Sequence, residues 1–126
     1  MRSIAFILAV IWVVPCIAIA ADINDIAGTW SGNWTPKGGV LDAMTIEARV
    51  ENGKIVGKFR TPVPMDFTRA TYDPKTGAVN IEAMDSKSGK TYKLVAKLMG
   101  NDIKGTIDVG GVPGDVLLIK WTYVPR

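Results

Sequence analysis

The sequence predicts an all-β fold, an eight-stranded antiparallel up-and-down barrel that follows a cleaved N-terminal signal peptide. Eight short runs alternate between apolar and polar residues, residues typical of tight turns separate them, and no segment after position 21 repeats its apolar residues with a helical period. Without crossover helices, successive strands pair as antiparallel neighbours. Closing such a meander into a barrel removes its two exposed edges, so we expect closure.

The first 20 residues have the features of a secretory signal peptide. Arg2 supplies an early positive charge, and residues 4–19 are apolar and uncharged, a run shorter than the roughly 20 residues of a membrane helix. The small residues in Ala18-Ile19-Ala20 suit signal peptidase, so we expect removal of residues 1–20 and a single mature domain at 21–126. Cleavage one residue later would leave Asp22 first. The protein is therefore expected to be secreted or periplasmic, with no stable membrane anchor.

Turn residues divide the mature chain into strands. Asn52-Gly53 between two alternating runs predicts a two-residue type I′ hairpin, because both of its positions need positive φ. The segment 73–77 and the pair Gly100-Asn101 mark two more reversals. The predicted strands are 28–35, 44–51, 54–60, 66–72, 78–85, 91–99, 102–109 and 116–124.

Alternation within the strands predicts which side chains face the interior. The inward positions expected from it are Met44, Ile46, Ala48, Val50, Val79, Ile81, Ala83, Tyr92, Leu94, Ala96, Leu98, Ile103, Gly105, Ile107, Val109, Leu117, Ile119, Trp121 and Tyr123. Strand 66–72 fits two registers. Either Phe67, Arg69 and Thr71 face inward, or Thr68, Ala70 and Tyr72 do and Arg69 is a surface charge.

Loop lengths give the predicted barrel two different ends. The connections 36–43, 61–65, 86–90 and 110–115 are longer than those at the other end, so they would surround a mouth where binding is usual. We expect a small apolar ligand there, and Arg69, if inward, would pair with a carboxylate. The candidate ligand-binding residues are Trp34, Met44, Phe59, Arg69, Tyr92 and Leu117. The alternative is a filled core, with the mouth loops presented to a protein partner or inhibited enzyme.

The start of the mature chain carries a family resemblance. Gly28-Thr29-Trp30 opens the first strand, and residues 28–31, 44–46 and 53–59 resemble the first three strands of an avidin. The chain thereby resembles the calycin group of small barrels, which includes lipocalins and avidins. The resemblance implies that Trp30 lies at the closed end under a basic side chain from the last strand, Arg126 or Lys120. Of these two, Arg126 is expected to reach the indole.

The amino-acid composition removes several common catalytic groups and metal ligands from the mature domain. Histidine is absent, and the one cysteine, Cys16, falls in the predicted leader, so the mature domain lacks the commonest general base, a thiol nucleophile and thiolate metal ligands. We expect no enzyme activity, metal or cofactor. The formal net charge is +3 for the whole chain, and basic residues alternate with acidic ones rather than forming a stripe. Nucleic acid is therefore not an expected partner.

Overall fold

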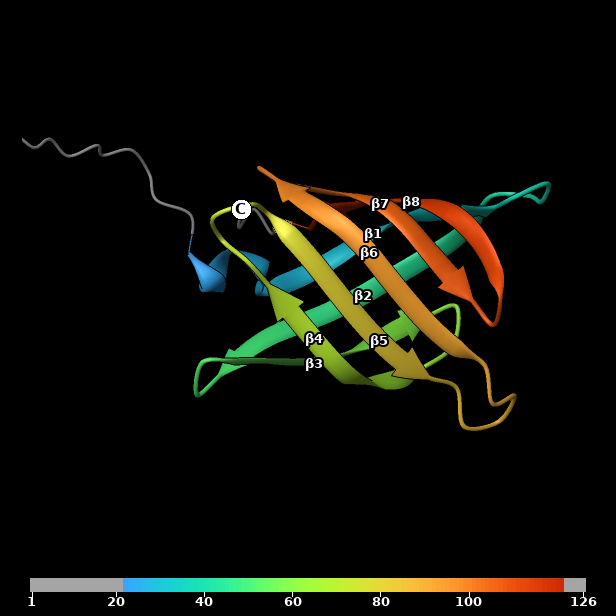
Figure 1. The fold of residues 1–126 in the computed structure, drawn as a ribbon, viewed down its shortest axis with the longest axis horizontal. Coiled ribbons are helices and arrows are strands. Elements are labelled where there is room, and N and C mark those ends of the chain that lie inside the picture. Colours follow the sequence, from blue (N-terminus) through green and yellow to red (C-terminus); the bar gives the residue numbers. More distant parts are fainter. Residues whose placement is uncertain (1–21, 122–126) are drawn as a thin grey trace, which may run out of the picture.

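The structure is a computed structural model that describes residues 22–121. The predicted signal peptide, Ala21, Tyr123 and Arg126 lie outside the described residues. Eight antiparallel strands form a closed barrel in sequence order, with β1 paired to both β2 and β8 (Figure 1). The predicted all-β, up-and-down barrel is confirmed, and it is compatible with the calycin-like fold that the resemblance implies. The elements are η2 (Ile23–Ile26), β1 (Gly28–Pro36), β2 (Asp42–Glu51), β3 (Lys54–Thr61), β4 (Met65–Tyr72), β5 (Ala78–Met84), β6 (Thr91–Met99), β7 (Asp102–Val109) and β8 (Val112–Lys120).

The hairpin at Asn52-Gly53 forms as predicted. Asn52 has φ of 54° and Gly53 of 76°, the left-handed conformation that a two-residue turn of this type requires. The flanking residues Glu51 and Lys54 pair directly across it. The local sequence therefore sets the β2–β3 register.

Strand β8 differs from the prediction in both length and orientation. Gly110 and Gly111, with φ of 60° and 96°, form a two-residue turn, so Val109 pairs with Val112 and the strand begins four residues earlier than expected. The expected loop 110–115 is therefore absent. The buried and exposed sides of β8 are also reversed, since Gly114, Val116 and Leu118 are buried. The inward placement predicted for three residues is wrong, and these face solvent: Leu117, Ile119 and Trp121.

The interior of the barrel is filled with side chains. A side chain that lined a water-sized internal space would keep accessible area, yet many of the inward residues have none or almost none. On β2, β5, β6 and β7 the inward faces match the alternation predicted from the sequence. The side chains at 0% or 1% exposure are Ile26, Trp30, Met44, Ile46, Phe59, Val79, Ile81, Ala83, Leu94, Ile103, Ile107 and Leu118.

Trp30 closes one end of the barrel. Its indole Nε1 donates to the carbonyl of Ile26 in η2 at 2.9 Å, so η2, which forms the lead-in to β1, crosses this end. Lys120, paired with Trp30 across β1 and β8, holds its ammonium 5.3 Å from the ring centroid and donates to the Asp25 carbonyl at 3.2 Å. Among the described residues, the basic side chain over the indole is thus Lys120, and the expected contact of Arg126 lies outside them.

Strand β4 combines the two registers that the sequence left open. A register shift between Phe67 and Arg69 lets Phe67 face the core while, beyond the shift, Ala70 and Tyr72 also pack against it. Arg69 is exposed, so its predicted inward alternative is wrong. The extra residue at the bulge reverses which positions face the core, so strict alternation along the whole strand predicts only one half of it correctly.

No helix within residues 22–121 has the length and hydropathy needed to span a membrane.

Candidate functional site

Four of the predicted ligand-binding residues meet inside the barrel. Trp34, Met44, Phe59 and Tyr92 come from β1, β2, β3 and β6, and none of them is more than 7% exposed. The rings of Phe59 and Tyr92 lie 5.8 Å apart in a tilted arrangement. These side chains pack on one another, so the region expected to be a pocket is occupied by the core itself.

Two polar groups remain among these four residues. Nε1 of Trp34 is buried and has no hydrogen-bond partner within residues 22–121. Burial raises the pKa of the Tyr92 hydroxyl above its ordinary value, and the carboxylates of Asp85 and Asp42 raise it further. An unpartnered buried N–H is uncommon and marks a place where an acceptor would be favourable.

The other two predicted residues lie elsewhere. Arg69 is on the outer side of β4, and Leu117 is on the outer face of β8. The structure therefore brings together the four interior residues and separates them from Arg69 and Leu117.

The barrel wall is split between β3 and β4. Only Lys58 with Asp66 and Phe59 with Met65 pair across these strands, although each strand has eight residues. Gly57 has φ of 154°, and a Cβ there would lie 2.0 Å from the Glu47 carbonyl oxygen and 2.9 Å from the Phe67 ring. Gly57 and the β4 bulge both lie directly beyond the two paired positions, and past them β3 and β4 no longer pair.

An open cleft of about 460 Å³ occupies this split. Its floor is mainly apolar, formed by Ile55 of β3, Ala70 and Tyr72 of β4, and Ile23 of η2. Two cationic residues lie on opposite sides of the cleft, Lys54 on β3 and Arg69 on β4. Within residues 22–121 neither of them forms an ion pair. The cleft thus combines apolar surface with unpaired positive charge.

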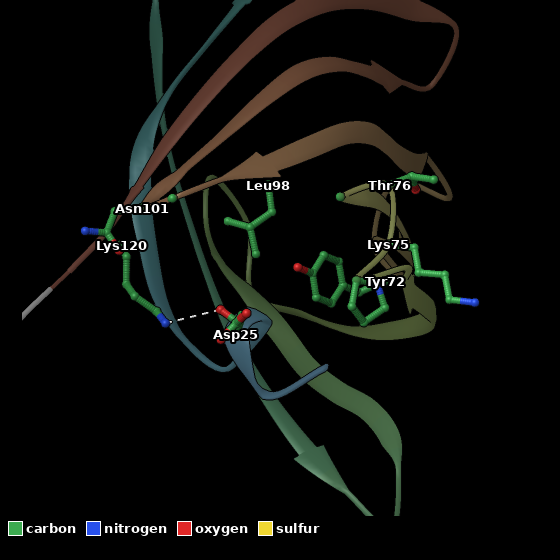
Figure 2. A pocket seen from close by; sticks show the side chains of 10 residues that line it. Asp25, Tyr72, Lys75, Thr76, Leu98, Asn101 and Lys120 are labelled. Atoms are coloured by element: carbon green, nitrogen blue, oxygen red, sulfur yellow. Dashed lines mark hydrogen bonds between the residues drawn. The ribbon is translucent and has the colours of Figure 1, made fainter. Parts of the chain in front are cut away.

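A second pocket, of about 370 Å³, lies on the other side of η2 at the closed end. Figure 2 shows the Tyr72 hydroxyl pointing into it, whereas the ammonium of Lys75 points away. Asp25, Thr76, Asn101 and Lys120 complete its polar lining. Because Tyr72 and η2 border both spaces, the cleft and this pocket are neighbours separated by the lead-in.

Tyr72 has a perturbed environment. Burial raises the pKa of its hydroxyl, and the carboxylates of Asp25, Asp73 and Asp22 raise it further, in that order. The hydroxyl therefore stays neutral to a higher pH than an ordinary tyrosine, and in that form it can both donate and accept a hydrogen bond.

Sequence reasoning missed the cleft because its lining comes from residues that look unremarkable alone. The glycine at position 57 within a strand was a usable signal, since a strand glycine often marks a bulge or a close backbone approach. The failed pairing between β3 and β4 depends on how the two strands meet, so Gly57 alone does not locate the cleft.

Within residues 22–121, no three histidine, cysteine, aspartate or glutamate side chains are grouped closely enough to hold a metal ion. No protein-family model matches the chain, and no curated protein matches it significantly.

Proposed function

We propose that this small β-barrel is a secreted or periplasmic binding module, not an enzyme, and that it binds a small apolar ligand with an anionic head group. The cleft between β3 and β4 carries the proposal, because it combines an apolar floor with two cations that form no ion pair within the described residues, at a break in the wall. This retains the apolar ligand expected from the sequence and moves its location from the mouth to the side of the barrel.

The chemistry of the cleft suits an amphiphile. Each methylene group buried against Ile55, Ala70 and Ile23 contributes about 0.8 kcal/mol. The head group would lie between Lys54 and Arg69, where a guanidinium can hold a carboxylate through two parallel hydrogen bonds. Tyr72 adds to the lining of the cleft, while its hydroxyl points into the neighbouring pocket (Figure 2).

Calorimetric titration with dodecanoate, below its micelle concentration, tests the proposal. Arg69→Gln and Lys54→Gln should each weaken binding about fivefold, the effect of a partly exposed charge contact of about 1 kcal/mol. Ala70→Phe should abolish binding by filling the floor. Arg49→Gln, an exposed arginine on β2, is the matched control and should leave the affinity unchanged. Wild-type protein that does not bind at about 1 mM, or binding that tolerates Ala70→Phe, would reject the cleft.

The interior site predicted from the sequence remains the competing location for the same ligand. The unpartnered Nε1 of Trp34 favours it, because a bound acceptor would satisfy that group. Amide chemical shifts in the same titration distinguish the two. Changes centred on Ile55 and Ala70 support the cleft, whereas changes centred on Met44 and Tyr92 support the interior.

A protein-interaction module with a filled core is the second candidate function. Two observations favour it: the interior is packed, and large apolar side chains remain exposed outside, including Val40 and Leu41 in the β1–β2 loop. The outer face of β8 shows this most clearly.

A further inference from the structure

Strand β8 is apolar on both faces. Val116 and Leu118 are buried in the barrel, while Leu117, Ile119 and Trp121 on the opposite side are 43%, 51% and 74% exposed. A continuous apolar run is typical of strands that are covered on both sides, whereas a strand with one solvated face alternates apolar and polar residues. The outer face of β8 therefore has the composition of a buried surface.

Charged neighbours flank this apolar strip in a defined order. Ile119 lies beside Asp102 of β7, and Leu117 lies beside Lys104, one step further along the same face. On the β1 side the neighbours are the neutral residues Ser31 and Asn33. Neither Asp102 nor Lys104 belongs to an ion pair within residues 22–121.

We propose that this face binds a second copy of the chain, forming a symmetric dimer. The pattern is self-complementary about the row that contains Ile103 and Leu118, which pair across β7 and β8. A two-fold axis across the strands at this row places Ile119 over Leu117 of the second copy. The same axis places Asp102 over Lys104 of the second copy, and symmetry produces each contact twice.

Trp121 extends the match beyond the central row. It lies three residues after Leu118, and Asp115 lies three before, so the axis brings Trp121 of one copy towards Asp115 of the other. Asp115 borders a groove of about 440 Å³ whose lining includes Leu41, Thr35 and Leu117. An indole is a suitable occupant, because its ring would cover the apolar side chains while its N–H faces a carboxylate.

The proposed interface leaves the ligand cleft free. Strands β7, β8 and β1 lie on one side of the barrel, and β3 and β4 lie across it (Figure 1). Self-association is thus independent of the proposed ligand, and either proposal can fail alone.

Sedimentation equilibrium of the exported, processed protein tests the dimer. We expect dimers at micromolar concentration and a dissociation constant at least about 100-fold weaker for Ile119→Lys, since it buries an unpaired charge. Met84→Lys on β5 is the matched control, because Met84 is equally exposed at 51% and lies away from β8. Circular dichroism of each variant establishes that it is folded.

Charge reversal tests the symmetry itself. Asp102→Lys and Lys104→Asp should each weaken the dimer about tenfold or more, because each brings like charges together twice. The double variant restores opposite charges and should return to within about threefold of wild type. A wild-type chain that stays monomeric at about 0.5 mM would overturn the proposal, whether or not a different protein binds this face. The proposal would also be overturned if Ile119→Lys left the dissociation constant of the dimer unchanged. The same holds if the double variant dimerised no more tightly than the single variants.

Discussion

At the scale of single residues, the closed end depends on Trp30 and Lys120. Trp30 has no exposed surface, and its N–H is satisfied by the lead-in at Ile26. Lys120 covers the ring and adds a hydrogen bond to the Asp25 carbonyl. The two residues therefore join the first strand, the last strand and η2 in one contact.

Replacing these two residues should have unequal effects. Trp30→Ala removes a fully buried ring and should lower the free energy of unfolding by about 3 to 5 kcal/mol. Lys120→Ala loses the cation over the ring and should cost about 1 kcal/mol. Urea unfolding followed by circular dichroism measures both. Equal midpoints for Trp30→Ala and wild type would contradict this role for the indole.

The two perturbed tyrosines predict a loss of stability in alkali. The pKa values of Tyr72 and Tyr92 are raised in the folded state, so the unfolded chain releases these protons first. Their contribution is complete below the ordinary tyrosine pKa of about 10 and is lost as pH rises through the folded values. Thermal unfolding between about pH 9 and 11.5 should show this decline. It should be shallower in Tyr72→Phe, and an unchanged slope would count against the shift.

At the scale of elements, Gly57 decides how β3 meets β4. Its positive φ and its contact with the Glu47 carbonyl leave no room for a side chain. The β4 bulge then places Phe67 against the glycine and turns Ala70 and Tyr72 inward. The cleft is thus a consequence of two local irregularities on facing strands.

Two glycine substitutions distinguish the cost of a strained backbone conformation from the cost of a steric clash of the added Cβ. Gly89 has φ of 75° and open space around it, so Gly89→Ala should cost about 1 to 2 kcal/mol from backbone strain alone. Gly57→Ala adds a collision with backbone and should cost about 3 kcal/mol or more. Denaturant unfolding of both variants provides the comparison. If Gly57→Ala were as stable as Gly89→Ala, the tight β2–β3 contact would be refuted.

At the scale of the whole molecule, the pairing of β1 with β8 closes the wall of the barrel, and η2 covers one of its ends. The lead-in η2 is fixed by a capping box in which the Asp22 N–H donates to the Asp25 carboxylate, 2.9 Å away, and the Asp22 carboxylate accepts from the Asn24 N–H, 3.0 Å away. The capping box begins at Asp22, one residue after Ala21 and close to the predicted cleavage site.

Cleavage at the predicted site would leave Asp22, the N-cap of η2, at or next to the new N-terminus. We expect the intact mass and the N-terminal sequence of the exported protein to show Ala21 or Asp22 as the first residue. A terminus at Asp22 would place an ammonium beside the Asp25 carboxylate and strengthen that contact. Exported protein that retains Met1 would disprove the leader assignment.

The sequence by itself determined the number of strands, their order, the Asn52-Gly53 hairpin and the inward faces of β2, β5, β6 and β7. These features follow from local turn chemistry and from alternation where only one face is apolar, so residues close in sequence suffice. The tertiary structure decided the orientation of β8, because both of its faces are apolar and only its pairing with β7 and β1 selects one. It also decided the cleft and the position of Arg69, because a bulge and a failed strand pairing depend on how two neighbouring strands meet in the closed barrel, which the alternation within either strand does not encode.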